Sequence, residues 1–490
     1  MTKDLLKKFL IAGAALRLLL LGAADFWYDE GVTVVFSRLP LDRLIDATAA
    51  DVHPPLYYLL PWSLEKLGLP LTEIVARFPS VLLSILAIYL TYLLAERLDL
   101  SREGKLVAVA WVTISPLQLH YAQEARMYAL LQALVLASFL MVLDRRYWVL
   151  AALLTAALYT HNYGLFYAPA LALVAAIREG WDWDRLLLRA APWNNWQPPV
   201  AIFFLLPVIA WVPWLRVLLG QMGTISGGYW IQPVSAGSVL YVFYKLFYAF
   251  NMPHEFIGVG VMMTGGLLTY TSWKIYKDRP PHYQVLLAVI VTPLALAVLM
   301  SLAWRPLLLF RGLIGTAVPL LLLVVKALEG VAVPYKRLYA YGMIAVVMVA
   351  GMVGHYQNNP GAKGNTQEWI SQLVQEYEAG DAVLALNDNG VIAMKTYAPQ
   401  LEVYKMTGCG EEALGSLAPG VRAALGIRER EAWQLQANRV IYISTLAPVS
   451  SKCEAEADAE LLGAYPKKQL IELSNDEYTT AGVYMLYKGY

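Results

Sequence analysis

Two acidic residues, Asp29 and Glu30, stand together shortly after the first apolar stretch of the chain. A carboxylate can take a proton from a hydroxyl group during group transfer when it is held against the reacting oxygen. The same pair also fits a solvated loop, where acidic neighbours are common. Asp51 and His53 follow, and His53 directly precedes Pro54, which restricts its backbone. These residues therefore leave both a chemical and a structural interpretation open.

A second polar segment runs from His120 to Tyr128 in the order His-Tyr-Ala-Gln-Glu-Ala-Arg-Met-Tyr. Glu124 and Arg126 within it fit an ion pair at the start of a helix. They also fit a binding site, because an arginine donates two parallel hydrogen bonds to a phosphate group. Later polar segments add His161, Arg305 and Arg311. Such groups are costly at membrane depth and usually face a cavity.

The composition indicates that most of this chain lies in a membrane. Apolar residues make up 58% and charged residues 15% of its 490 residues, and the mean hydropathy is +0.49, whereas soluble domains are about a quarter charged. The net charge of +1 gives no indication of a nucleic-acid partner. We expect a helical membrane bundle over residues 1–355, with a first external loop at 25–76, and a soluble domain over 356–490.

The apolar stretches predict about eleven transmembrane helices. Two neighbouring stretches are short and form either two spans or one broken helix. The expected spans are Phe9–Ala24, Arg77–Glu96, Lys105–Leu119, Met127–Leu143, Trp148–Thr160, Gly164–Ile177, Pro199–Leu219, Phe256–Trp273, Gln284–Ala303, Leu307–Lys326 and Leu338–Gly354. Pro54–Leu67 and Ser238–Phe250 are too short to cross and are expected to lie at the external face.

Positive charge predicts the orientation of the bundle, since cytoplasmic loops carry an excess of lysine and arginine. Lys3, Lys7 and Lys8 place the N-terminus in the cytoplasm, and further basic clusters fall on every second loop. An odd number of spans then places the C-terminal domain outside the cytoplasm. The polar residues described above all fall at or near this external face, where we expect them to line one water-filled cavity. The aromatic run Phe26–Tyr28 beside them is typical of a membrane interface.

The C-terminal segment has the pattern of a small α/β domain. Asn365 and Glu368 resemble a capping box that opens a helix reaching Glu378. The expected strands are Ala382–Leu386, Leu401–Lys405, Val440–Ser444, Gln469–Leu473 and Val483–Tyr487. Both cysteines, Cys409 and Cys453, lie here, and their spacing fits a disulfide as well as two free buried thiols.

The order of three motifs resembles a known family. An Asp-Glu pair follows the first span, Asp-x-His-Pro-Pro-Leu begins at Asp51, and Gln-Glu-Ala-Arg-Met-Tyr begins at Gln123. Together they look like the GT-C superfamily of glycosyltransferases, and most of all glycosyltransferase family 39, with protein O-mannosyltransferases and the lipid A aminoarabinose transferase among its relatives. Phe310-Arg311-Gly312 before Pro319 resembles a late Arg-Tyr…Pro segment less closely, because Gly312 replaces an aromatic residue.

The resemblance implies transfer of a sugar from a polyprenyl-phosphate donor to an acceptor hydroxyl on the external face. It makes Asp29 the candidate general base, and Glu30 would orient the acceptor or hold Asp29. One base and direct displacement imply inversion at the anomeric carbon. The departing lipid phosphate needs cations in a site of low dielectric. The candidates for this role are Arg126 and Arg311, with His53 or Arg305 assisting.

Four further residues are candidates to contact the substrate or to support the site. They are Asp51, Glu124, Tyr128 and His161. Asp51, His53, Glu124 and His161 also have oxygen and imidazole ligands that suit Mg²⁺, Mn²⁺ or Zn²⁺. Their positions on separate loops are not diagnostic of a metal site. The sequence therefore leaves both alternatives open, an enzyme that uses such an ion and one that does not.

Two other classes of protein fit part of the pattern. A secondary transporter also has many helices and buried charges, but it usually shows internal repeats around a midplane site. A lipid-carrier flippase or assembly subunit of an envelope glycan pathway would share the location in the plasma membrane. The sequence identifies neither the sugar nor the acceptor, for which a glycolipid, a glycan and a protein hydroxyl all remain open.

Overall fold

The computed structural model of the chain describes residues 1–182, 186, 199–224, 231–249, 252–362, 365–407, 417–431, 434–435, 437–444, 461, 463, 465, 467–475 and 480–487. Contacts within it divide the chain into two compact units. The helical unit comprises Met1–Leu19, Arg77–Leu215 and Ile231–Tyr356. The mixed unit comprises Leu20–Ala76, Arg216–Trp230 and Gln357–Tyr490. The first external loop and the C-terminal segment thus belong to the same unit.

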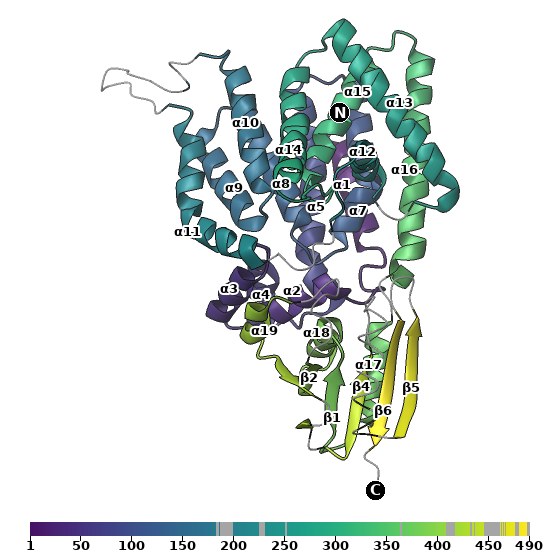
Figure 1. The fold of residues 1–490 in the computed structure, drawn as a ribbon. Helices are drawn as coiled ribbons and strands as arrows, with labels where there is room; N and C mark the ends of the chain where they lie inside the picture. The colour runs from purple at the N-terminus through teal and green to yellow at the C-terminus, as the bar shows by residue number, and fades with distance from the viewer. Residues whose placement is uncertain are drawn as a thin grey trace. The chain divides into compact units, whose positions relative to one another are not determined.

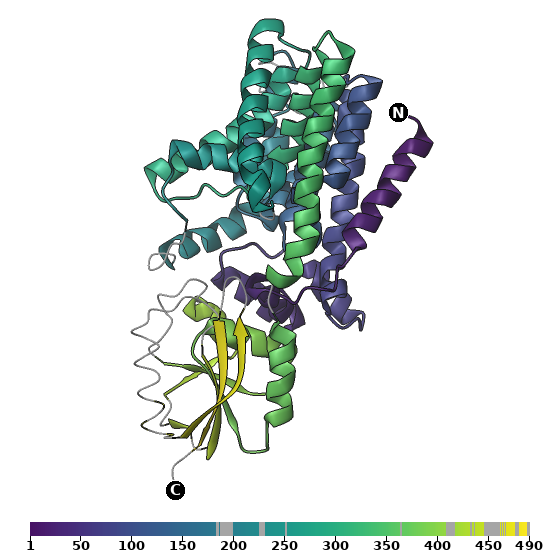
Figure 2. The same ribbon diagram turned by 90° about the vertical axis from the view of Figure 1, so that its right-hand side faces the viewer.

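The helical unit is built almost entirely from apolar α-helices (Figure 1). They are α1 (Lys3–Leu18), α5 (Glu73–Arg97), α6 (Arg102–Ile114), α7 (Pro116–Ala122), α8 (Tyr128–Leu143), α9 (Tyr147–Thr160), α10 (Gly164–Arg178), α11 (Ile202–Thr224), α12 (Ala236–Tyr248), α13 (His254–Asp278), α14 (Tyr283–Ala303), α15 (Ala317–Glu329) and α16 (Pro334–Ala362), with a 3₁₀ turn, η3, at Ile314–Thr316. Figure 2 shows α16 lying along the other helices of this unit.

Four of the described helices, α5, α11, α14 and α16, are long and apolar enough to cross a membrane. Three shorter apolar helices, α8, α9 and α10, accompany them. The apolar stretch of α11 is only 22% buried, which suits a lipid-facing helix because lipid solvates apolar side chains. A multi-pass membrane protein is therefore the correct class, while the expected total of about eleven spans stays a prediction.

Three of the expected spans differ clearly from the helices that form. Phe9–Ala24 is helical only as far as Leu18, the end of α1. Lys105–Leu119 is divided into α6 and α7 at Pro116, because proline has no N–H group to continue the helix. In Leu307–Lys326 the α-helix begins only at Ala317. The two short stretches form separate helices, α9 and α10, which pack against each other and against α8. The broken-helix alternative is therefore wrong.

The mixed unit combines short helices with a sheet. Its helices are α2 (Tyr28–Arg38), α3 (Leu41–Ala50), α4 (Leu59–Lys66), α17 (Thr366–Glu376), α18 (Asp388–Tyr397) and α19 (Pro419–Ala424). Its strands are β1 (Ala382–Ala385), β2 (Val403–Met406), β3 (Arg428–Arg430), β4 (Arg439–Ile443), β5 (Lys467–Asn475) and β6 (Thr480–Tyr487). Among the described residues the sheet has six strands in the order β3-β2-β1-β4-β6-β5, parallel from β3 to β4 and antiparallel beyond. The predicted C-terminal α/β structure is confirmed, and β3 is an addition.

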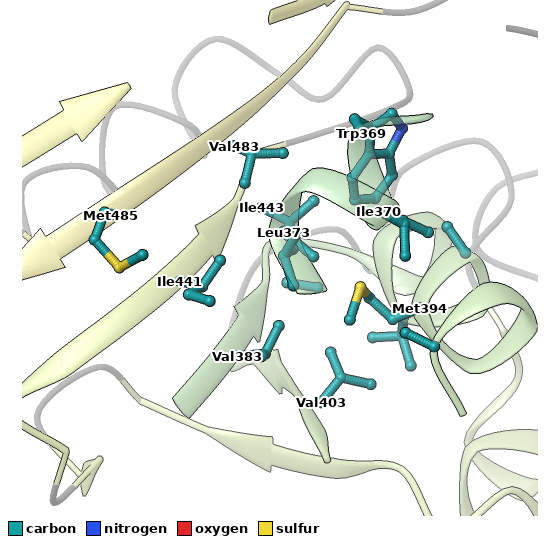
Figure 3. Close-up of a cluster of buried hydrophobic side chains, with 14 residues drawn as sticks. Trp369, Ile370, Leu373, Val383, Met394, Val403, Ile441, Ile443, Val483 and Met485 are labelled. Atoms are coloured by element: carbon teal, nitrogen blue, oxygen red, sulfur yellow. The ribbon is translucent and has the colours of Figure 1, made fainter. Parts of the chain in front are cut away.

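The side chains of β1 alternate between the two faces of the sheet and contact an apolar core on each face. Val383 and Ala385 face one core, while Leu384 faces another on the opposite side of the sheet. The first core also contains Trp369 of α17 and Met394 of α18 (Figure 3). Helices α17 and α18 therefore cover the same face, and α18 is fixed against the sheet by apolar contact.

Two smaller predictions concern this segment. Asn365 is the N-cap residue of α17, as expected, but its side-chain amide donates to the carboxylate of Glu368 at 3.3 Å, so the observed contact joins the two side chains. Cys409 and Cys453 lie outside the described residues. The disulfide therefore stays a prediction.

Gly312 provides a test of packing in the helical unit. A Cβ atom there would lie 2.6 Å from the ring of Tyr163, so Gly312→Ala should destabilise the protein by about 1–3 kcal/mol through overpacking. In Gly265→Ala, on α13, the new Cβ would meet no atom within 4 Å, and the loss of chain entropy in the unfolded state should stabilise by about 0.4–1 kcal/mol. Thermal unfolding in detergent measures both, and equal effects would contradict the packing explanation.

Candidate active site

The acidic pair lies in the first turn of α2, in the mixed unit. This position suits two carboxylates, because the N-terminus of a helix carries partial positive charge. Glu30 is fully buried, whereas Asp29 is partly exposed and can meet a substrate. Thr33 Oγ1 donates to the Asp29 carbonyl at 3.1 Å and tightens the turn. The geometry suits the division of roles in which Asp29 reacts and Glu30 supports.

Tyr28 and Asp51 lie in the same electrostatic environment as Asp29. Burial raises the pKa of the Tyr28 phenol well above its usual value, and the carboxylates of Asp388, Asp29 and Asp51 raise it further. The phenol thus keeps its proton at neutral pH and can donate a hydrogen bond. Phe26 is buried in the mixed unit, while Trp27 is partly exposed, and the interfacial interpretation of this run stays a prediction.

The C-terminal segment supports the acidic helix directly. Helix α2 packs against α18, and α3 packs against α19 (Figure 1). A Cβ atom at Gly31 would lie 2.8 Å from Ile392, so the next position after the acidic pair needs glycine for this close approach. At the other end of α2, Arg38 donates to the carbonyls of Lys395 and Thr396 at 3.1 and 2.8 Å.

Hydrogen bonds also hold the chain just before α2. Tyr397 Oη accepts from the amide of Phe26 at 2.7 Å and donates to Glu73 at 2.7 Å. The carboxylate of Asp25 accepts from the amide of Gln367 at 2.7 Å, at the start of α17. The position of the acidic pair is thus determined by residues more than 300 positions later in the chain.

In the helical unit, the Gln-Glu-Ala-Arg-Met-Tyr motif forms the buried connection between α7 and α8. Gln123 Oε1 lies 2.9 Å from Nε2 of His355, while Gln123 Nε2 donates to the carbonyls of Arg17 and Leu19 at 3.0 and 2.6 Å. Glu124 Oε2 lies 3.9 Å from Nε2 of His120. The motif is therefore fixed on several sides by polar contacts.

Three predicted site residues meet beside this connection. The guanidinium group of Arg311 lies 5.7 Å from the centre of the Tyr128 ring, in cation–π geometry. The rings of Tyr128 and His161 are 5.9 Å apart. Arg126 is buried and acts electrostatically on His161 together with Arg311. Tyr128, His161 and the two arginines thus form one group, which we call the arginine cluster.

His161 is a neutral member of this cluster. Burial, with the positive charges of Arg311 and Arg126, lowers its pKa to about 3. Its Nδ1 accepts from the amide of Tyr163 at 3.0 Å, so the proton of the neutral ring is on Nε2. The two arginines therefore provide the positive charge of the cluster, and the imidazole can only add a neutral donor.

The segment that carries Arg311 is held by tyrosines of the α9–α10 connection and of α10. Tyr163 Oη donates to the Leu307 carbonyl and accepts from the Leu309 amide, and Tyr167 donates to the Gly312 carbonyl at 3.2 Å. These contacts replace helical hydrogen bonds and explain why α15 starts late. They also explain Gly312, because the Tyr163 ring occupies the space of a side chain.

The predicted residues fall into two groups, one in each unit. Asp29, Glu30, Asp51 and His53 belong to the mixed unit, and the arginine cluster and Glu124 belong to the helical unit. Arg305 lies in the helical unit over the ring of its neighbour Trp304, 5.8 Å from the ring centre. A single cavity lined by both groups stays a prediction.

The four candidate metal ligands are divided between the two units. Nowhere in the described part of the chain do three or more His, Cys, Asp or Glu residues form a group that could hold a metal ion. Of the four candidates, Asp51 and His53 lie in one unit and Glu124 and His161 in the other. We therefore assign no step of the chemistry to a metal, and the ion stays an untested expectation.

Two residues of the mixed unit were not predicted from the sequence. Asp388 is buried beside Arg422, with Oδ2 of Asp388 3.3 Å from Nε of Arg422. The available signal was an Asn-Asp-Asn run directly after the apolar strand Ala382–Leu386, since ligands of α/β sheets bind at the carboxyl ends of strands. The effect of Asp388 on the pKa of Tyr28 could not be predicted from the sequence, because it depends on the folded chain.

Comparison with solved structures identifies the fold. ArnT from Cupriavidus metallidurans in the apo state matches with a TM-score of 0.62 and 13% identity, over 97% of this chain and 97% of that chain. The same protein bound to undecaprenyl phosphate also gives a TM-score of 0.62 and 13% identity, over 99% of this chain and 98% of that chain. No model of a known protein family matches the sequence, and no curated protein does either.

The chain has the fold of ArnT. The match extends over nearly the whole of both chains, so it includes the C-terminal α/β segment, which was expected from its own strand pattern. Since the identity is 13%, the comparison establishes the fold and leaves the reaction to be argued from the residues.

The neutral state of His161 predicts how stability responds to acid. Below pH 6.5 the unfolded chain takes up a proton at this imidazole, while the folded protein, with a pKa of about 3, does not. Stability is therefore full above pH 6.5 and falls as the pH drops towards 3. His161→Asn keeps an acceptor for the Tyr163 amide. It should make the melting temperature fall less steeply between pH 7 and pH 4.5, because unfolding of the variant no longer takes up the one proton that His161 binds.

A matched control is His254→Asn, at the exposed start of α13. This side chain is exposed and lies outside the arginine cluster, so the variant should keep the acid profile of the wild type. A profile of His161→Asn that parallels the wild type would show that this histidine is not the neutral, buried group described above.

Proposed function

We propose that this protein is an inverting glycosyltransferase that moves a sugar from a polyprenyl-phosphate carrier to an acceptor hydroxyl. The observation that carries the proposal is the GT-C fold, matched over 99% of the chain to a structure with bound undecaprenyl phosphate. The arginine cluster supports it, because buried guanidinium groups are suited to a phosphate at the membrane. The partly exposed Asp29 supports it from the mixed unit.

The acceptor side of the reaction needs a base. Asp29 takes the proton of the acceptor hydroxyl as that oxygen attacks the anomeric carbon. The bond to the carrier phosphate breaks on the opposite face, so the configuration inverts. Glu30 is fully buried under the first turn of α2 and holds the turn that presents Asp29. Helix α18 supports the same turn through its close packing at Gly31.

The donor side needs positive charge. As the sugar departs, the carrier phosphate gains negative charge, and fixed cations stabilise that charge most in a site of low dielectric. Arg126 and Arg311 supply the two positive charges. The ring of Tyr128 lies against Arg311 in cation–π geometry, and His161 is neutral, so neither of these two side chains adds a charge that would compete with the phosphate.

The proposed location follows from the charge pattern. The basic residues Lys3, Lys7 and Lys8 before the first apolar stretch favour a cytoplasmic N-terminus in the plasma membrane. The mixed unit, with Asp29 and the C-terminal segment, then lies outside the cytoplasm. The acceptor is a glycolipid, glycan or protein hydroxyl at that face. A flippase would move the carrier across the bilayer and leave the sugar attached, so consumption of the donor separates the two functions.

Substitution of the base gives the direct test. Asp29→Asn should reduce sugar transfer by about 10²–10⁴-fold, because a positioned base contributes on that order. A panel of radiolabelled undecaprenyl-phosphate sugars is first tested with the wild-type enzyme, and membrane glycolipid serves as the acceptor. The assay then uses the sugar that the wild-type enzyme consumes. Asp42→Asn, at an exposed position of α3 in the same unit, is the control and should retain the wild-type rate. Near-normal transfer by Asp29→Asn would exclude this residue as the base.

The arginine cluster has a separate test that needs no sugar. Arg126→Ala and Arg311→Ala should each weaken binding of undecaprenyl phosphate by about tenfold or more, since a hydrogen bond to a charged group contributes about 1.5–3 kcal/mol. Arg126→Lys should recover only part of the affinity, because lysine lacks the planar pair of donors. Arg102→Ala, at the exposed start of α6, controls for a general loss of positive charge. Unchanged affinity in both alanine variants would remove the cluster from the phosphate site.

A further inference from the structure

The hydroxyl group of Tyr121 is buried in the helical unit. Tyr121 lies on α7 and is 3% exposed. Its Oη meets no hydrogen-bond donor or acceptor in the part of the chain that the structure describes. A buried tyrosine hydroxyl usually has such a partner, because leaving a polar group unpaired in the interior is unfavourable. This hydroxyl therefore needs an explanation other than packing.

The ring of Tyr121 adjoins the arginine cluster. Its centre lies 4.8 Å from the centre of the Tyr128 ring, and the guanidinium group of Arg311 lies 5.7 Å from that same centre. The ring of His120 lies nearly perpendicular to the Tyr121 ring, with 4.9 Å between the two centres. Direct ring contact with Tyr128 thus places Tyr121 beside the two arginines.

Helix α7 holds this ring in a fixed position. The carbonyl of Gln118 accepts from Ser84 Oγ at 3.3 Å. Gln123, directly after the helix, donates to the carbonyl of Arg17 at 3.0 Å. The Tyr121 hydroxyl is therefore in place before a ligand binds. A preorganised donor of this kind loses little conformational freedom on binding, which favours affinity.

The surroundings of the hydroxyl indicate which kind of ligand it suits. Burial raises the pKa of Tyr121 well above its usual value, and the charge of Glu124 raises it further. The phenol therefore keeps its proton and is a neutral donor. The positive charges of Arg126 and Arg311 would repel a metal cation and attract an anion. A hydrogen bond from a hydroxyl group to an anionic oxygen is among the strong ones, so a phosphate group fits both the phenol and the arginines.

We propose that Tyr121 is a third donor to the carrier phosphate, with its Oη donating a hydrogen bond to a phosphate oxygen held by Arg126 and Arg311. The inference rests on the proposed function, because it assumes that the arginine cluster binds that phosphate. During transfer the bond between the anomeric carbon and a phosphate oxygen breaks, and its electron pair stays on that oxygen. The phenol keeps its own proton and stabilises the added charge through the hydrogen bond.

The test compares two lipids that differ only in the phosphate group. Tyr121→Phe should weaken binding of undecaprenyl phosphate by about tenfold, because it removes a hydrogen bond to a charged group. Binding of undecaprenol, the alcohol without the phosphate, should stay at the wild-type level. The phenylalanine ring retains the contacts with Tyr128 and His120. Native mass spectrometry of the full-length protein measures both affinities.

Tyr341→Phe is the matched control. Tyr341 lies on α16 and is 4% exposed, and its hydroxyl also has no hydrogen-bond partner among the described residues. Its ring packs edge-on to Trp111, with 5.8 Å between the centres, and it is not a member of the arginine cluster. The control variant should bind both lipids like the wild type. A similar loss of undecaprenyl phosphate in both variants would overturn the inference.

Thermal unfolding separates a binding role from a structural one. Tyr121→Phe should keep the melting temperature of the ligand-free protein, because the hydroxyl has no partner to lose within the described chain. Undecaprenyl phosphate should then raise the melting temperature of the variant less than that of the wild type. A lower melting temperature without ligand, or an equal loss of affinity for both lipids, would show that the hydroxyl serves the fold, and the inference would fail.

Arg126→Ala and Arg311→Ala are measured in parallel to distinguish the two levels of the proposal. If both arginine variants lose affinity for undecaprenyl phosphate and Tyr121→Phe does not, only the role of Tyr121 is wrong. If none of the three loses affinity, the cluster does not bind the phosphate, and the role of Tyr121 fails with it. Loss in all three, confined to the phosphorylated lipid, supports both proposals.

Discussion

The cost of removing charged groups from water governs this structure. In a chain that is 15% charged, each buried charge needs a partner, because an isolated ion in a low-dielectric interior is highly unfavourable. The buried cations of the helical unit find such partners in different ways. Arg17 is fully buried and gives its donors to Ser84 and to three carbonyls, two of them in the last turn of α6. Lys326 likewise donates to the carbonyls of Leu98 and Asp99, after the end of α5. Both cations use the partial negative charge of a helix C-terminus.

The arginine cluster meets the same cost in another way. Arg311 rests on the ring of Tyr128, and both Arg311 and Arg126 face a histidine that is kept neutral. A cation over an aromatic ring retains its full charge. The cluster thus combines two guanidinium groups with aromatic and imidazole rings, whereas Arg17 donates to carbonyls at a helix C-terminus. Guanidinium groups are suited to binding phosphate.

Much of the fold could be predicted from local patterns, and the rest required contacts between distant residues. Long apolar stretches predicted α5, α14 and α16, and short runs with the composition of strands predicted most of the strands. The late start of α15 could not be predicted, because it depends on Tyr163, about 150 residues earlier. The motif Gln123–Tyr128 was identified correctly as a special segment, but its partners His355 and Arg17 lie on other helices. Spacing along the chain holds no information on such pairs, and the pairing of Asp388 with Arg422 was missed for the same reason.

The mixed unit shows why a candidate base near the N-terminus depends on residues near the other end of the chain. Glu30 is fully buried, and the surface that buries α2 includes α18. Asp25 and Phe26 before α2, and Arg38 at its end, all bond to residues beyond 360. Without these partners a short helix would be only marginally stable in water, and its buried carboxylate would draw in solvent. The C-terminal segment therefore stabilises the fold of the segment that carries Asp29.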